Sequence, residues 1–221
     1  MNKNSNLVKV VLADDHILLR DALANMVENM SGFAVIYTAS NGEDLKAQIV
    51  AKGAPDLLIL DLNMPKMDGF ETAQWLNKSY PEVKILVLTM YDSEVTLIRL
   101  LQSGVRGFLK KDSHPNELSF AIKNVVENGY YYSSNASNQL ANLFTNKYNQ
   151  KETLEKVILN EREIEFLKLS CSEMTYKEIA QKMGMNPRSL ENYRESMFSK
   201  LNIKSRVGLA LYAVKHGLVR F

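Results

Sequence analysis

Apolar and polar residues alternate in two different rhythms along the first 130 residues of the chain. Short runs of Val, Ile and Leu bounded by polar residues predict strands, and apolar positions recurring every three to four residues predict helices. The predicted strands cover residues 7–15, 33–39, 55–61, 84–89 and 105–111, and the predicted helices cover 17–30, 42–53, 68–80, 93–104 and 114–129. This alternation predicts an α/β fold, a doubly wound five-stranded parallel sheet with helices on both faces.

The pattern changes after Gly129. Residues 131–155 are rich in Asn and Ser and predict a linker, with a helical piece over 136–146. From 156 to 221 every signal is helical, which predicts a small all-α domain of four helices. Its predicted helix starts include two capping boxes, Asn160 with Glu163 and Thr175 with Glu178, and a third start at Asn186–Pro187. We therefore expect two domains, 1–130 and 156–221.

Charge is distributed unevenly between the two predicted domains, although the net charge of the whole chain is only +2. Residues 1–150 hold 14 Lys and Arg against 16 Asp and Glu, whereas residues 151–221 hold 13 against 9. The acidic front and basic back indicate modules with different partners. The single cysteine excludes an internal disulfide, and no apolar run approaches the length of a membrane span, so we expect a cytoplasmic protein.

Three predicted strands of the first domain end in side chains with related chemistry. The first strand runs into Asp14 and Asp15, the third ends at Asp61, and the fourth ends at Thr89. If the strand order is 2-1-3-4-5, the carboxylates meet at one edge of the sheet, where open parallel sheets bind ligands. Carboxylates so close together repel one another, and Mg²⁺, which prefers oxygen ligands, relieves the repulsion. The alternative is that each acidic residue simply terminates a strand.

With a divalent cation and a lysine from the fifth strand, this edge of the sheet predicts a pocket that accepts a phosphoryl group. Asp61 is the predicted nucleophile, and Thr89 offers a hydroxyl to a phosphoryl oxygen. These residues resemble the receiver domains of two-component response regulators, in the segments "LADDH", "DLNMPKMDG", "VLT" and "GFLKKD".

The resemblance to receiver domains implies a role for each matching residue. Asp61 is the implied phosphoacceptor. Asp15 is the implied Mg²⁺ ligand, with Asp14 assisting, and Asn63 contributes a backbone carbonyl. The implied switch and phosphate-binding residues are Thr89, Phe108 and Lys111.

Two adjacent lysines, Lys110 and Lys111, compete for the role at the fifth strand. Neighbouring side chains of a strand point to opposite faces, so only one can reach the site. The receiver pattern places the active lysine three positions after the aromatic residue, which selects Lys111 over Lys110.

In the second domain, the segments "TYKEIAQKM" and "RSLENYRESMFSKL" have helix-turn-helix proportions. One face of the second segment is apolar and predicts packing, and the other carries side chains suited to base edges and phosphates in DNA. The candidate DNA-binding residues are Lys182, Arg188, Glu191, Asn192, Arg194, Glu195, Lys200, Lys204 and Arg206.

The stretch from Leu159 to Val219 resembles the LuxR-type DNA-binding domain, and the two domains together resemble the NarL/FixJ branch of response regulators. The resemblance implies a transcriptional regulator that a sensor histidine kinase phosphorylates and that binds double-stranded DNA as a homodimer. The implied dimerisation residues on the last helix are Val207, Leu211 and Val214, for which core packing is the alternative.

Glu191 and Glu195 depart from the LuxR pattern, in which basic residues are common at these positions. The two carboxylates either read cytosine or pair with Arg188 and Arg194 at helical spacing. A further alternative is a response regulator whose DNA-binding face has decayed and that acts through protein–protein interaction.

An enzyme that turns over through an aspartyl phosphate is the remaining alternative. Such phosphohydrolases usually need an acid–base carboxylate two residues after the nucleophile, and that position is Asn63. We therefore expect no enzyme beyond self-phosphorylation or self-dephosphorylation.

Overall fold

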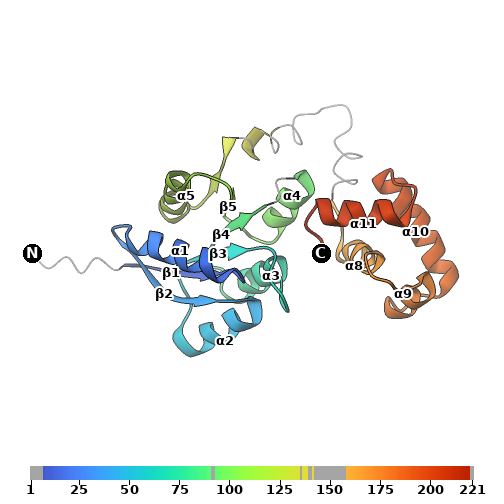
Figure 1. Cartoon of the computed structure of the whole chain (residues 1–221), viewed down its shortest axis with the longest axis horizontal. Coiled ribbons are helices and arrows are strands. Elements are labelled where there is room, and N and C mark those ends of the chain that lie inside the picture. Colours follow the sequence, from blue (N-terminus) through green and yellow to red (C-terminus); the bar gives the residue numbers. More distant parts are fainter. Residues whose placement is uncertain (1–6, 91–92, 135, 139–140, 142–157, 220–221) are drawn as a thin grey trace, which may run out of the picture. The chain divides into compact units, whose positions relative to one another are not determined.

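The computed structural model describes residues 7–90, 93–134, 136–138, 141 and 158–219. The chain divides into two compact units, a sheet with its covering helices and a bundle of C-terminal helices (Figure 1). The predicted helical piece over 136–146 is described only in part, and residues 136–138 and 141 are helical. The rest of the predicted linker, from 142 to 155, lies outside the described residues.

The first unit is built on a parallel sheet in the order β2-β1-β3-β4-β5-β6. Its strands are β1 Val8–Ala13, β2 Phe33–Ala39, β3 Leu57–Asp61, β4 Lys84–Thr89, β5 Gly107–Lys110 and β6 Tyr131–Tyr132. All five predicted strands are confirmed, as is their order. Every residue of β3 is buried, which explains its uninterrupted apolar sequence in the centre of the sheet.

The prediction of five strands needs one correction, because β6 adds a sixth. Tyr131 and Tyr132 pair in parallel with Gly107 and Phe108 of β5. Two residues are too few to show a strand pattern, so both tyrosines were expected in the linker. The sheet edge next to β5 is therefore covered by the chain that leaves the domain.

Helices cover both faces of the sheet, as predicted. They are α1 Ile17–Glu28, α2 Gly42–Lys52, α3 Gly69–Ser79, α4 Glu94–Gln102 and α5 Pro115–Asn128. α1 and α5 share one core with inward side chains of β1, β3 and β4, such as Leu12, Ile59 and Leu86. α2 and α3 lie on the other side of the sheet (Figure 1).

The second unit contains α8 Glu161–Ser170, α9 Tyr176–Lys182, α10 Pro187–Leu201 and α11 Arg206–Lys215. Both predicted capping boxes are confirmed, at Asn160 with Glu163 and at Thr175 with Glu178. The core between these helices includes large buried side chains from all four: Phe166, Ile179, Leu190, Met197 and Leu209. Because α10 contributes Leu190 and Met197 to this core, its opposite face is left to solvent.

Candidate functional sites

The carboxylates of the first unit meet where neighbouring strands end. Asp14 directly follows β1, and Asp61 is the last residue of β3, its neighbour in the sheet. Ligand atoms of Asp14, Asp15, His16 and Asp61 all lie within 4.8 Å of one another. The structure thus brings together the three carboxylates that the sequence analysis selected.

Gly69 lets the start of α3 approach this site closely. Its backbone N–H donates to the carbonyl of Leu62 at 2.9 Å. A Cβ at this position would lie 2.3 Å from the backbone oxygen of Asp61 and 2.6 Å from the Cα of Leu62. Only glycine fits such an approach, so the "DG" pair that follows the loop fixes the backbone of Asp61 against α3. Asp68 caps that helix through a capping box with Glu71.

Lys111 lies between the two buried carboxylates. Its Nζ is 2.9 Å from Asp14 Oδ2 and 2.9 Å from Asp61 Oδ2, and its side chain is only 10% exposed. The backbone N–H of Lys111 donates to the carbonyl of Thr89, which holds the residue beside the end of β4. Of the two candidate lysines, Lys111 is the one whose ammonium lies between Asp14 and Asp61.

The electrostatics of the site are dominated by burial. Burial raises the pKa of Asp61, because little water remains to solvate its charge; the hydrogen bond and charge of Lys111 oppose this shift, and the nearby Asp14 adds to it. Burial lowers the pKa of Lys111, but its contacts with Asp14 and Asp61 outweigh burial, and the net pKa is raised. Lys111 therefore only partly offsets the effect of burial on the pKa of Asp61.

The donor set fits a hard divalent cation. Asp61 Oδ2 is buried, and the ammonium of Lys111 lies 2.9 Å from it. Asp14 is almost fully buried, whereas Asp15 is partly exposed, so a hydrated ion can reach the carboxylates. Oxygen ligands of this kind suit Mg²⁺. Asn63, the proposed source of a carbonyl, follows Asp61 closely, and its backbone N–H bonds to the Asp61 carboxylate.

Thr89 and Phe108, the candidate switch residues, both lie in the buried sheet. Thr89 ends β4 and is fully buried, and Phe108 is 3% exposed in the neighbouring β5. The Phe108 ring lies 5.8 Å from the ring of Tyr132 in β6.

Two further residues, neither of them among the predicted site residues, contact the acidic pair. His16 precedes α1, and its Nδ1 lies 3.1 Å from Asp14 Oδ1 and 3.0 Å from Asp15 Oδ1. Arg20, one turn into α1, donates from Nη1 to the backbone carbonyl of Asp14 at 2.8 Å. The contact of Arg20 could have been predicted from its position in the sequence, because Arg20 lies one helical turn after the residues that follow the acidic pair.

The helix-turn-helix of the second unit is formed by α9 and α10. Gly184, with a φ of 64°, turns the chain after α9, and Asn186 caps α10 with Pro187 in its first turn. Leu190 and Met197 are buried. The candidate DNA-binding residues that are exposed are Lys182, Arg188, Glu191, Asn192, Glu195 and Lys204.

Two further candidate DNA-binding cations are engaged inside their own domain. Lys200 Nζ lies 2.7 Å from Glu163 Oε1 of α8 and donates to the carbonyl of Ile158 at 2.9 Å. Arg206 donates to the carbonyl oxygens of Ser170 and Ser172. In this conformation both side chains connect helices of the C-terminal unit to neighbouring backbone or side-chain groups. Their positions in the sequence did not predict these contacts.

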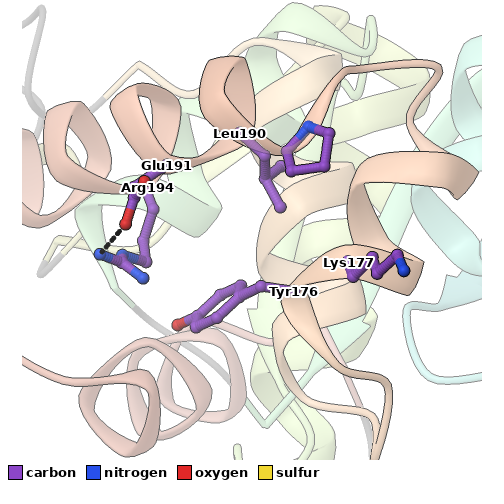
Figure 2. A pocket seen from close by; sticks show the side chains of 6 residues that line it. Tyr176, Lys177, Leu190, Glu191 and Arg194 are labelled. Carbon is purple, nitrogen blue, oxygen red and sulfur yellow. Dashed lines mark ion pairs between the residues drawn. The ribbon is translucent and has the colours of Figure 1, made fainter.

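Arg194 contacts both acidic residues of α10; its contact with Glu191 has the helical spacing of the pairing alternative, whereas Glu195 is its immediate neighbour in the sequence. Its Nη2 lies 2.7 Å from Glu195 Oε1 and 3.9 Å from Glu191 Oε1. Figure 2 shows Arg194 above the ring of Tyr176, beside a pocket of about 250 Å³ between α9 and α10.

The candidate dimerisation residues are placed on α11. Val207 and Leu211 are 68% and 65% exposed and lie one turn apart, whereas Val214 is partly buried. The same helix buries Leu209 and Ala213, so its core-facing residues are distinct from the exposed pair. Across the described part of the chain, no helix has the length and apolar character needed to cross a bilayer.

Comparisons with known proteins cover both units. The family described as the response regulator receiver domain matches residues 10–123, and the family described as bacterial regulatory proteins, luxR family, matches residues 157–213. The oxygen regulatory protein NreC of Staphylococcus epidermidis is 33% identical over 97% of this chain and 100% of its own length. The response regulator UvrY of Escherichia coli strain K12 is 31% identical over 96% of each protein.

A solved structure is similar over most of the chain. RcsB of Salmonella enterica serovar Typhimurium, bound to promoter rprA with a beryllofluoride phosphomimetic, is similar with a TM-score of 0.68 and 23% identity. The match covers 94% of this chain and 98% of that one. From these matches and the geometry of the acidic site, the chain belongs to the NarL/FixJ-type response regulators, which join a receiver domain to a luxR-family DNA-binding domain.

Proposed function

We propose that phosphorylation of Asp61 controls how the C-terminal domain binds double-stranded DNA, so that the chain switches transcription in a two-component system. The observation that carries the proposal is the convergence of Asp14, Asp61 and Lys111 at one buried point. In this account residues 1–130 form the receiver, 131–155 the linker and 156–221 the DNA-binding domain.

The phosphoryl donor is the phosphohistidine of a cognate sensor histidine kinase. A carboxylate oxygen of Asp61 forms the new P–O bond while the P–N bond breaks, and the imidazole leaves with that electron pair and takes up a proton. Asp14, Asp15, Asp61 and the backbone carbonyl of Asn63 would hold Mg²⁺. When bound, the ion neutralises charge on the transferring phosphoryl oxygens.

Three residues respond to the phosphorylated aspartate. Lys111 exchanges its contact with the Asp61 carboxylate for a phosphoryl oxygen, and the Thr89 hydroxyl donates to another. The movement of Thr89 changes the space available to Phe108 in the adjacent strand. Phosphorylation thereby shifts the population between two arrangements of the receiver.

In the output domain, α10 enters the major groove, and the candidate DNA-binding residues contact bases and phosphates. Val207, Leu211 and Val214 of α11 join two copies on a two-part operator. The exposure of Val207 and Leu211 supports this dimer. We place the protein in the cytoplasm with its DNA target, and we assign it no activity beyond self-phosphorylation and self-dephosphorylation.

A second candidate function is a regulator that acts through protein partners because its DNA-binding face has decayed. The contacts of Lys200 with Glu163 and of Arg206 with Ser170 favour it, since they withdraw two cations from DNA in this conformation. The exposed carboxylates of Glu191 and Glu195 also favour this second function, because they repel DNA phosphates.

The direct test of the phosphoacceptor is incorporation of radiolabelled phosphate from acetyl phosphate in the presence of Mg²⁺. Asp61→Asn is expected to abolish labelling while circular dichroism remains unchanged. Asp21→Asn, which alters an exposed carboxylate on α1, is expected to label like the wild type. Label retained by Asp61→Asn contradicts the assignment.

A further inference from the structure

The exposed surface of α10 carries an arrangement of charge that DNA binding alone does not explain. Arg194 donates two hydrogen bonds to Glu195, from Nε at 3.2 Å and from Nη2 at 2.7 Å. Glu191 lies on its other side, at 3.9 Å from Nη2. One cation is thus shared by two carboxylates on the helix that is proposed to enter the major groove. Glu191, Arg194 and Glu195 together carry a net charge of −1.

Arg194 is anchored to the domain, whereas its acidic partners extend into solvent. Its guanidinium carbon lies 5.0 Å from the ring centre of Tyr176 and 5.8 Å from that of Phe198. The Arg194 side chain is 25% exposed, against 67% for Glu191 and 61% for Glu195. An approaching duplex therefore meets the two carboxylates before it meets the arginine.

The surroundings of Arg194 allow it to change partner. The pocket beside it is lined by Tyr176, Leu190 and Pro187, and its volume of about 250 Å³ gives the guanidinium room to change rotamer (Figure 2). Exposed ion pairs contribute little to stability, so exchanging one for a contact with DNA costs little.

The two carboxylates respond differently to different DNA. An arbitrary duplex presents phosphates along its backbone, and these repel Glu191 and Glu195. In the major groove, the amino group of cytosine is a hydrogen-bond donor that a glutamate accepts. A base without a donor at that position leaves the carboxylate desolvated and unpaired, which is unfavourable.

We infer that Glu191, Arg194 and Glu195 form a specificity filter on α10. The two carboxylates oppose binding to arbitrary sequence and accept the amino groups of cytosines in the operator, while Arg194, released from Glu195, contacts an adjacent phosphate. Tyr176 is a positioning residue that holds Arg194 within reach of both partners. This inference rests on the proposed DNA binding and adds the base that the site selects.

The test is selection of bound sites from a randomised duplex library by full-length protein with Mg²⁺ and beryllofluoride. The wild type is expected to enrich cytosine at fixed positions of each half-site. Glu195→Gln is expected to lower the preference for cytosine at one of these positions about tenfold, and Glu191→Gln at another. Glu165→Gln, which removes an exposed charge on α8 outside the helix-turn-helix pair, is expected to leave the preference unchanged.

Binding to duplex of random sequence gives a second readout. In Glu195→Gln, Arg194 is free to neutralise one more phosphate, so the plot of log K against log salt is expected to steepen by about 0.9. Tyr176→Phe keeps the aromatic ring and is expected to retain the cytosine preference, whereas Tyr176→Ala is expected to weaken it.

The possible results distinguish a failure of the specificity filter from a failure of the proposed DNA binding. If the wild type binds DNA and Glu191→Gln and Glu195→Gln keep its base preference and salt dependence, the filter is refuted and the regulator stands. If the wild type binds no duplex even at low salt, both are refuted.

Discussion

At the scale of single residues, the acidic site depends on one ammonium group that stabilises two carboxylates buried away from water. Lys111 contacts both Asp14 and Asp61 at 2.9 Å in a place where almost no side-chain surface is exposed. Removing one partner of such a buried ion pair leaves charge uncompensated, which is more costly than any surface substitution.

Lys111→Ala is therefore expected to lower the free energy of unfolding by about 3 kcal/mol in the absence of Mg²⁺. It is also expected to abolish the response to beryllofluoride, because the phosphoryl group loses its cation. Urea denaturation of the variant and of Lys110→Ala measures the difference between the two lysines. Equal effects of the two substitutions show that the selection of Lys111 is wrong.

Gly69 provides a second test at this scale. Gly69→Ala places a Cβ against the backbone of Asp61 and Leu62, so we expect a loss of about 1–3 kcal/mol in stability together with weaker Mg²⁺ binding. Gly53→Ala is the matched comparison, since Gly53 has a φ of 91° but open space around it. It should cost about 1 kcal/mol and leave Mg²⁺ binding intact. Normal Mg²⁺ affinity in Gly69→Ala would show that the close approach does not position Asp61.

The sequence allowed the acidic residues to be predicted because strand ends are local properties, and the resemblance to receiver domains selected Lys111 from the two lysines that side-chain alternation left open. It did not allow the partners of Lys200 and Arg206 to be predicted. These side chains reach α8, which lies more than thirty residues earlier in the chain. Contacts of that kind depend on how the helices pack, and no periodicity in the sequence records them.

At the scale of elements, β6 is the feature that sequence patterns missed. It pairs with β5 so closely that a Cβ on Gly107 would lie 2.8 Å from the backbone oxygen of Tyr131. Phe108 lies opposite Tyr132 in the register, with their rings 5.8 Å apart, and Tyr130 stacks on Tyr132. The strand next to the candidate switch residue is therefore the start of the connection to the second unit.

Tyr132→Ala is expected to destabilise the receiver by about 1–2 kcal/mol, because a half-buried ring loses its aromatic neighbours. Tyr130→Ala is the comparison, since Tyr130 is 63% exposed and its removal should cost less than about 0.5 kcal/mol. Thermal unfolding of both variants measures the costs. If Tyr132→Ala lowers the stability as little as Tyr130→Ala does, the Tyr132 side chain of β6 does not stabilise the sheet.

The longer elements were predictable for physical reasons that differ between the two units. β3 is buried on both faces, so its sequence is uniformly apolar, and the helices of the second unit carry their own start signals in Asn160, Thr175 and Asn186. Most errors were of one or two residues at element ends, where pairing rather than residue type decides. β1, for example, was expected over 7–15 and spans Val8–Ala13.

At the scale of the whole molecule, a mildly acidic receiver, which is expected to bind a cation, is joined to a basic domain, which is expected to bind an anion. Residues 1–150 carry a net charge of −2 and residues 151–221 a net charge of +4. The two halves can therefore be tested separately by the ions that each is expected to bind.

Mg²⁺ is expected to raise the unfolding temperature of the protein by several degrees, because ion bound only to the folded state adds about 2.7 kcal/mol at one hundred times its dissociation constant. Asp15→Asn is expected to remove most of this gain, and Asp21→Asn to retain it. Scanning calorimetry with MgCl₂, compared with NaCl of equal ionic strength, measures the shift. An equal shift in both salts excludes a specific site.

The most direct test of the central claim is the affinity for operator DNA with and without beryllofluoride, in the presence of Mg²⁺ and at fixed salt, for the wild type and for Asp61→Asn. We predict binding that beryllofluoride strengthens at least tenfold in the wild type and leaves unchanged in Asp61→Asn, since that gain requires about 1.4 kcal/mol of coupling between the sites. Identical affinities in all four conditions would contradict the coupling of Asp61 to DNA.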